Sequence, residues 1–126
     1  MYVGDPCASV WGNGDIGAQI LAAVTALSAP GGKVVIIPKV SGACYDDATT
    51  VPLTTLGKYI QIEWAGSNGF LGTSTPQNCI NWTLSSGTAF TIDYSTGTGI
   101  PAASTFGLKN IFLINNNCVT NGGCGG

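Results

Sequence analysis

The sequence lacks histidine and arginine altogether, and only 8% of its 126 residues are charged. Without histidine, the common zinc sites built from cysteine and histidine cannot form, and the five cysteines show no CxxC spacing. The four lysines are scattered and the net charge is -2, so no basic stripe is available to neutralise a phosphate backbone. We therefore expect no nucleic-acid partner and no metal site.

Long apolar runs are also missing. No stretch approaches the roughly 20 apolar residues that span a bilayer, and Met1 is not followed by the basic and apolar regions of a signal peptide. The apolar share of 44% is enough for one core, which indicates a single domain over residues 1–126, either complete or the first part of a longer chain. Low charge with abundant Gly, Ser, Thr and Asn is typical of a secreted or surface-exposed β-rich protein. We predict no membrane insertion and a location outside the cell or on a cell or virion surface.

Disulfides are the better interpretation of the five cysteines. Cys118 and Cys124 are separated by five residues and could close a small loop, and Cys7 could pair with Cys44. The odd count leaves one thiol over, either as a buried free cysteine or as a link to another chain.

One helix is expected near the N-terminus. Asp15 is a plausible N-cap, and Pro30-Gly31-Gly32 ends the helical pattern. The apolar stripe between them consists of Ile16, Ile20, Leu21, Val24 and Leu27. The β-branched run Val34–Ile37 follows and predicts a strand that is covered on both faces.

The rest of the chain alternates between apolar and polar residues in short stretches. Strands are predicted at 59–64, 80–84, 90–94 and 108–115. Comparing Ile36 with Ile62, Ile62 with Trp82, and Ile92 with Phe112 suggests a recurrence of roughly 20 to 26 residues, which is typical of solenoid coils. An antiparallel sandwich is the alternative.

The first half of the chain resembles the N-terminal region of pectate-lyase-type right-handed parallel β-helix proteins. Their stretch D-x-G-x-x-I-x-x-A-x-x-x-L…GG-x-V-x-I-P-x-G-x-Y is matched here by Asp15, Gly17, Ile20, Ala23, Leu27, Gly31, Gly32, Val34 or Val35, Ile37, Pro38 and Tyr45. Leu108-Lys109-Asn110-Ile111 is similar to the coil start L-x-N-L, while Val40-Ser41 displaces the usual Gly after Pro38. The resemblance implies a mainly β protein, a right-handed parallel β-helix whose N-terminal α-helix caps the first coils.

No family catalytic residue can be carried over. A pectate-lyase-like mechanism needs an arginine base, and a polygalacturonase-like one needs histidine beside clustered aspartates. This chain has neither arginine nor histidine. Enzymatic activity is therefore uncertain, and a lyase or glycosidase would need further coils.

The acidic residues form no obvious centre. Asp46 and Asp47 are the only adjacent pair, but neighbouring side chains on an extended segment point in opposite directions, so we expect a solvated loop. Glu63 and Asp93 are expected on outward strand positions. No EF-hand or tandem repeat supports Ca²⁺, and we expect no cofactor.

The aromatic residues offer a route to sugars. Tyr59 with Gln61 and Glu63 is the best candidate for an exposed carbohydrate-binding strip, whereas Trp64, Trp82 and Tyr94 are expected in the core. The sequence thus favours an extracellular β-helix protein related to polysaccharide-processing or polysaccharide-binding families, without catalysis, whose partner is a polysaccharide or glycan. The alternative is a structural subunit that stacks coil ends into a homo-oligomer or filament.

Overall fold

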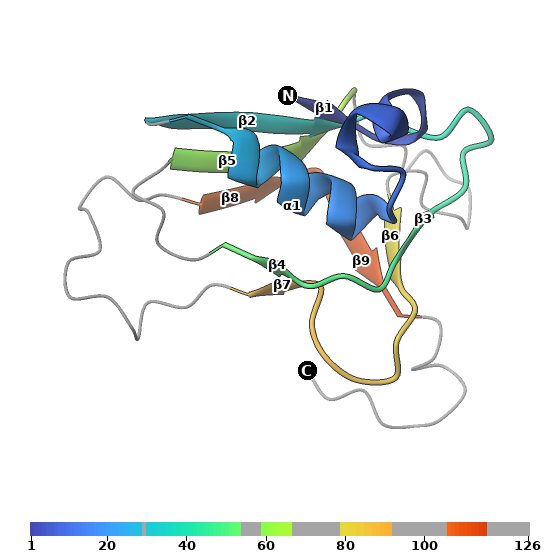
Figure 1. The fold of residues 1–126 in the computed structure, drawn as a ribbon. Coiled ribbons are helices and arrows are strands. Elements are labelled where there is room, and N and C mark those ends of the chain that lie inside the picture. The colour runs from blue at the N-terminus through green and yellow to red at the C-terminus, as the bar shows by residue number, and fades with distance from the viewer. Residues whose placement is uncertain (29, 54–58, 67–78, 92–105, 116–126) are drawn as a thin grey trace.

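The computed structural model describes residues 1–28, 30–53, 59–66, 79–91 and 106–115. One α-helix, one 3-10 helix and nine short strands occur in this part of the chain (Figure 1). In chain order they are β1 (Tyr2–Val3), η1 (Asp5–Trp11), α1 (Ile16–Ala26), β2 (Gly31–Ile36), β3 (Tyr45–Asp47), β4 (Val51–Pro52), β5 (Tyr59–Trp64), β6 (Cys79–Trp82), β7 (Phe90–Thr91), β8 (Phe106–Lys109) and β9 (Phe112–Ile114).

The strands form three parallel sheets. We name them sheet A, with strand order β1-β2-β5-β8, sheet B, with order β3-β6-β9, and sheet C, which pairs β4 with β7. From β2 to β9 the chain visits the sheets in the rotation A, B, C, so each strand lies beside the strand that occupies the same place in the next rotation (Figure 1). Every strand pair among the described residues is parallel, which confirms a mainly β chain of parallel strands and contradicts the antiparallel sandwich.

The recurrence inferred from the sequence was placed wrongly. Ile62 lies opposite Val34, not Ile36, and it shares no sheet with Trp82. The connections between strands differ in length, so similar apolar residues at a fixed spacing fall on strands of different sheets. Hydrogen bonding along the backbone decides the register instead.

Helix α1 covers one side of these sheets (Figure 1). Asp15 caps it as predicted, because its side chain accepts a hydrogen bond from the Ala18 N–H. The helix contacts β1 and β2 of sheet A, β3 of sheet B and β4 of sheet C. Its apolar face joins the strand interiors in one core. The buried members of this core are Val3, Ile16, Ile20, Ala23, Val24, Leu27, Val34, Ile36, Tyr45, Val51, Leu53, Ile60, Ile62, Trp64 and Ile80.

Several predicted strands need correction. The stretch 108–115 is two strands in two sheets, because Asn110 adopts a left-handed conformation, with φ of 58°, between β8 and β9. Strand β2 is buried on one face only, since Val34 and Ile36 are fully covered while Val35 is half-buried. The expected solvated loop at Asp46 and Asp47 is strand β3.

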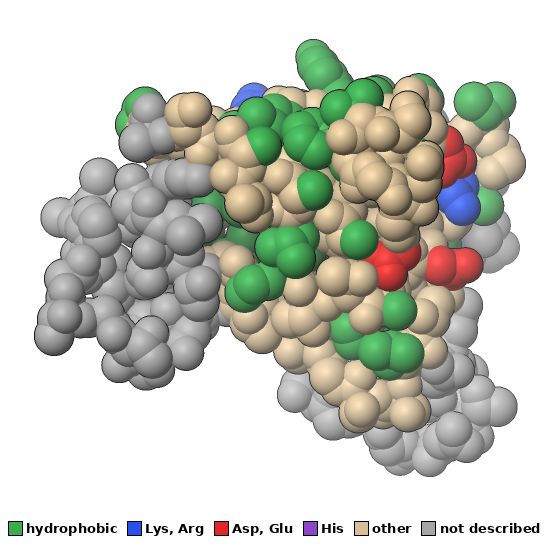
Figure 2. All heavy atoms as spheres, in the orientation of Figure 1, with side chains coloured by type: hydrophobic (Ala, Val, Ile, Leu, Met, Phe, Trp, Pro, Cys, Tyr) green, Lys and Arg blue, Asp and Glu red, His purple; other side chains and the backbone are tan. Residues whose placement is uncertain are grey.

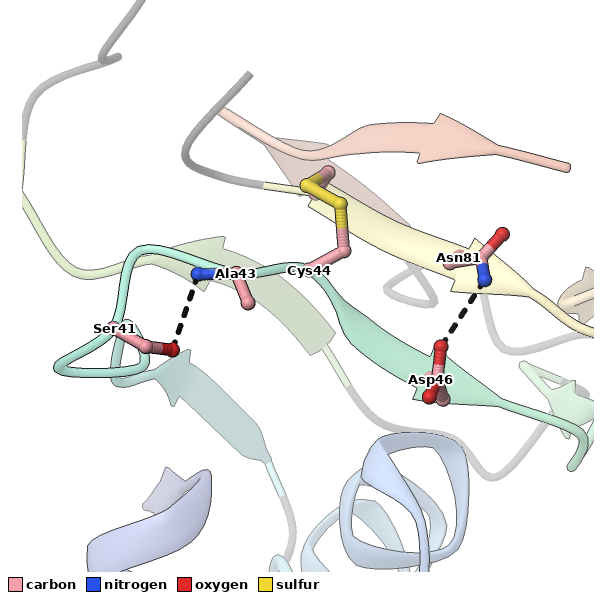
Figure 3. Close-up of a disulfide and its surroundings, with 6 residues drawn as sticks. Ser41, Ala43, Cys44, Asp46 and Asn81 are labelled. Carbon is pink, nitrogen blue, oxygen red and sulfur yellow. Dashed lines mark hydrogen bonds between the residues drawn. A yellow bond between two sulfur atoms is a disulfide. The ribbon is translucent and has the colours of Figure 1, made fainter. Parts of the chain in front are cut away.

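A disulfide joins Cys44 to Cys79, so the predicted pairing of Cys44 with Cys7 is wrong (Figure 3). The reason is the register of β3 and β6, in which Tyr45 lies opposite Ile80 and the preceding cysteines come side by side, with Cα atoms 4.7 Å apart. Cys7 is a free thiol in η1. Cys118 and Cys124 lie outside the described residues.

The disulfide is consistent with an extracellular protein. Within the described ranges, no helix combines the length and apolar character that a membrane crossing requires.

Candidate functional site

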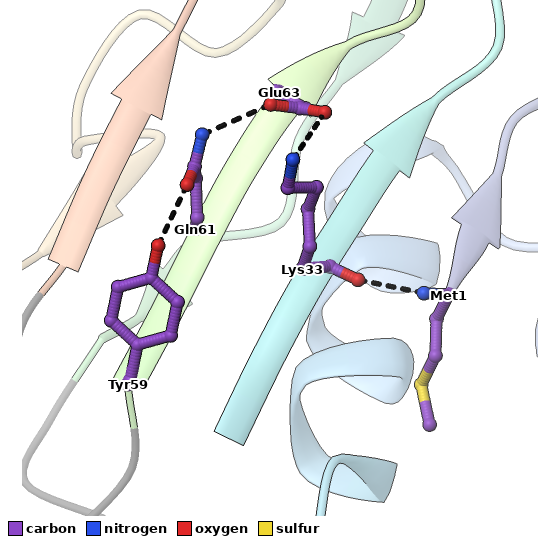
Figure 4. Close-up of polar contacts among 5 residues, drawn as sticks. All are labelled: Met1, Lys33, Tyr59, Gln61 and Glu63. Carbon is purple, nitrogen blue, oxygen red and sulfur yellow. Dashed lines mark hydrogen bonds and ion pairs between the residues drawn. The ribbon is translucent and has the colours of Figure 1, made fainter. Parts of the chain in front are cut away.

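Tyr59, Gln61 and Glu63 lie in a row on the outer face of β5, and we call them the outer strip (Figure 4). The alternating residues Ile60 and Ile62 point into the core and are at most 1% exposed. Because successive side chains of a strand point to opposite faces, burial of one set presents the other set to solvent. The predicted strip is therefore brought together on one face.

Hydrogen bonds run along the outer strip in one direction. The Tyr59 hydroxyl donates to Gln61 Oε1 at 2.7 Å, and Gln61 Nε2 donates to Glu63 Oε2 at 2.9 Å (Figure 4). Both bonds run in the direction of Glu63, so the row ends at its carboxylate. The Tyr59 ring is held by its hydroxyl while 45% of the residue stays exposed, so the strip offers a fixed aromatic surface beside amide and hydroxyl groups.

Lys33 completes the row from the neighbouring strand, and the sequence reasoning missed it. Its Nζ lies 3.0 Å from Glu63 Oε1, with the lysine side chain 48% and the glutamate side chain 18% exposed (Figure 4). The parallel register of β2 and β5 places Lys33 opposite Gln61, one outward position from Glu63. Aligning the two strands from Gly31 and Tyr59 onward would have revealed this contact. The Met1 amine donates to the Lys33 carbonyl at 2.6 Å and so attaches β1 beside β2.

Gly31 lets β2 approach the start of the strip. It has a φ of 115°, and a side chain at this position would collide with the backbone of Tyr59. The Tyr59 N–H donates to the Pro30 carbonyl at 2.7 Å, which fixes the two strands at this point. The helix ends earlier, at Ala26, and the glycines of the Pro-Gly-Gly segment predicted to end it begin β2, where this segment positions the aromatic residue of the strip.

The charge of the outer strip is balanced internally. Lys33 neutralises Glu63, and Lys109 of β8 lies opposite Glu63 on its other side, exposed and without an ion pair among the described residues. Charged side chains are few on the face of the molecule shown in Figure 2.

Asp47 is a second chemically distinctive group. The residue is 1% exposed, its Oδ1 accepts a hydrogen bond from the Thr49 N–H at 2.9 Å, and its Oδ2 is buried with no partner among the described residues. Burial raises the pKa of Asp47 to about 6; the negative charge of Asp15 adds to this, and the backbone N–H groups of Thr49 and Gly17 oppose it. Tyr45 and Asp47 are two positions apart on a strand and therefore share its inward face. This spacing was the signal for the inward carboxylate.

Asp46 points away from Asp47, as the sequence predicted for neighbours on an extended segment. Its Oδ1 accepts a hydrogen bond from Asn81 Nδ2 at 3.1 Å on the outer side of sheet B (Figure 3). The two carboxylates therefore do not form an acid/base pair. Asp93 and Tyr94 lie outside the described residues, while Trp64 and Trp82 are buried as expected.

In the part of the chain that the structure describes, no group of three or more His, Cys, Asp or Glu residues could hold a metal ion. No protein-family model matches the chain, and no curated protein or solved structure matches it either.

Proposed function

We propose that this chain is the capped end of a right-handed parallel β-helix and that it works outside the cell. Three features support the proposal: all strand pairs of the described residues are parallel, the chain visits three sheets in a fixed rotation, and α1 contacts strands of all three sheets. A helix that packs on the edge strands β3 and β4 covers apolar side chains that have no neighbouring strand on that side among the described residues. The disulfide between Cys44 and Cys79 fits an oxidising environment.

We further propose that the chain binds a polysaccharide through the outer strip without cleaving it. The observation that carries this is the exposed ring of Tyr59, fixed by its hydrogen bond to Gln61 in a row that continues to Glu63 and Lys33. The apolar face of a sugar ring packs on an aromatic ring, while sugar hydroxyls exchange hydrogen bonds with amides and carboxylates. Because the row is already ordered, binding loses little side-chain entropy.

The acidic groups support binding rather than catalysis. Asp15 and Asp47 are close enough to interact electrostatically, but Asp47 is covered and cannot reach a sugar. Glu63 forms an ion pair with Lys33, and the sequence has no histidine or arginine that could assist Glu63 in catalysis.

Affinity electrophoresis of the 126-residue chain through gels containing a neutral glucan, a xylan or a polyuronate tests the proposal. At least one polysaccharide should retard the chain, and Tyr59→Ala should weaken this binding about tenfold, the equivalent of about 1.4 kcal/mol. Tyr2→Ala is the matched control, because Tyr2 is 61% exposed on sheet A but not part of the row. Equal losses in the two variants, or no retardation in any gel, would contradict binding through the strip. Release of sugar fragments would contradict the absence of cleavage.

A structural role is the second candidate, and one observation favours it. Leu108 of β8 and Leu113 of β9 occupy register positions that are buried on the preceding strands, yet they are 44% and 48% exposed. Such apolar edges of a stack can be covered by a second copy of the chain.

Sedimentation of the chain over a range of concentrations tests this role. Assembly that disappears in the double variant Leu108→Lys and Leu113→Lys, but persists when the exposed loop residue Val40 is changed to Lys, would support it. A monomer at every concentration would contradict it.

A further inference from the structure

The first turn of α1 rests on the corner between β3 and β4, and Asp15 ties the two together. Its Oδ1 accepts a hydrogen bond from the Ala18 N–H at 2.8 Å inside the helix. Its Oδ2 accepts one from the Ala48 N–H at 3.2 Å and one from Thr49 Oγ1 at 2.9 Å on the corner. One carboxylate thus caps the helix and holds it against the sheets.

Asp47 lies at the same joint. A side chain at Gly17, in the first turn of α1, would collide with Asp47 Oδ1 and the Thr49 carbonyl, so the helix backbone packs directly on this carboxyl group. Asp47 Oδ2 is buried there without a partner among the described residues. When Asp47 is ionised, a negative charge is therefore enclosed at a contact between two elements.

The backbone N–H groups of Thr49 and Gly17 offset part of this charge, but the charged groups around Asp47 do not compensate it. The sequences of α1, β4 and β6 contain no Lys, Asp or Glu, and the cysteine of β6 is in the disulfide. Asp15 adds a second negative charge, and Asp46 points to the opposite side of β3. On η1, Asp5 and Cys7 act on Tyr45 at the other end of β3. Lys39 lies over the Tyr45 ring, and no described cation acts on Asp47.

We propose that Asp47 is a proton-operated latch, which holds the first turn of α1 on the β3–β4 corner when it is protonated and releases that turn when it is ionised. The neutral acid removes both the enclosed charge and its repulsion with Asp15. Ionisation favours any opening that lets water reach Oδ2. Strand β3 resists opening because it pairs with β6 and is preceded by the disulfide. The helix turn is held to the corner by the side-chain bonds of Asp15 and by the buried side chain of Ile16, without a backbone cross-link of this kind.

The direction of the response follows from the pKa of Asp47, which lies near 6 in the folded chain against an ordinary value of 3.8. The closed joint binds the proton more tightly than the open one does. The latch is therefore closed in acid and loosens as the pH rises through about 6, when the proton leaves.

Hydrogen exchange of the 126-residue chain at about pH 4.5 and about pH 7.5 tests the latch, with rates expressed as protection factors so that the intrinsic pH dependence cancels. Amides in the first turn of α1 should lose protection by up to about thirtyfold at the higher pH, because a group with a pKa of about 6 in the closed joint and 3.8 in the open one is only partly protonated in the open joint at pH 4.5. Amides of β2 and β5 should change far less. Asp47→Asn, a neutral isostere, should keep α1 protected at both pH values. Equal loss of protection in α1, β2 and β5, or the same pH response in Asp47→Asn, would overturn the proposal.

A second measurement does not depend on the variant folding. Carbon-13 NMR of the wild-type side chain gives the titration midpoint of Asp47, and the amide shifts of Gly17 and Ala18 give that of the helix turn. A shared midpoint supports the latch, and midpoints separated by more than about one pH unit contradict it.

Discussion

The side of the sheets covered by α1 and the opposite side, formed by β8 and β9, differ in how well they bury inward-facing residues. Ile62 and Leu108 are register partners in sheet A, yet Ile62 is fully buried while Leu108 is 44% exposed. In sheet B, Ile80 is fully buried and its partner Leu113 is 48% exposed. At the opposite end, Val34 is fully buried although it lies close to the edge of its sheet.

The difference shows that an inward position on a strand is not enough for burial, because the neighbouring strands or helix must also cover it. An inward side chain is covered when a strand lies on each side of it, or when α1 takes the place of one of these strands, as it does beside Tyr45 of β3 and Val51 of β4. Helix α1 and β1 provide that cover for β2, because both contact it. Strands β8 and β9 are the last strands described in sheets A and B, and their apolar residues stay open to solvent. We therefore expect stability to be concentrated on the capped side.

The largest effect is expected from the disulfide on this side. Replacing Cys44 and Cys79 together by serine removes a cross-link between residues 35 positions apart, and the loop-entropy relation gives a loss of about 4 kcal/mol. Urea denaturation of the two proteins measures it, with Cys7→Ser as the matched control because Cys7 is a free thiol. A double variant as stable as the control would show that the cross-link does not support the stack.

Truncating register partners tests the comparison directly. Ile62→Ala should lower the free energy of unfolding by about 3 kcal/mol, since it leaves a cavity in a fully buried site. Leu108→Ala should cost less than about 1 kcal/mol, because 44% of the residue is already exposed. Chemical denaturation of both variants gives the two values. Similar losses would mean that both ends are equally well packed.

The pH dependence of stability probes the joint between α1 and the sheets. Because the pKa of Asp47 is raised to about 6 in the folded chain, the folded state binds the proton more tightly than the unfolded state. The resulting stability is fully present below about pH 4 and is lost as the pH rises through 6, which amounts to about 3 kcal/mol. Denaturation at a series of pH values should show this fall in the wild type and not in Asp47→Asn. Stability that rises over this range would contradict the assignment.

Some features of the fold could be predicted from the sequence. The Asp15 cap, the apolar helix stripe and the strand 59–64 follow from local patterns, and each is present. The outward placement of Tyr59, Gln61 and Glu63 follows from the same alternation, although only Tyr59 is exposed and the other two are half-buried. Patterns of this kind need only the residues within one element.

What the sequence could not predict depends on which strands are neighbours. The partner of Cys44, the contact of Lys33 with Glu63 and the burial of Asp47 all follow from register or from packing between elements. Connections of unequal length conceal that register. The break at Asn110 was missed for a related reason, because one residue in a left-handed conformation turns an apparently continuous strand from one sheet into the next.

The smallest effect is expected on the outer face, where the ion pair of Lys33 and Glu63 lies. Nearly half of the lysine side chain is exposed, so water screens the pair, and Lys33→Ala should change the free energy of unfolding by less than about 0.5 kcal/mol. Chemical denaturation at low and high salt measures this. A loss above about 1 kcal/mol would place the outer strip among the structural contacts of the stack. A negligible loss would leave the row free to serve binding, so that Lys33→Ala and Tyr59→Ala could be compared on polysaccharides without a change in fold.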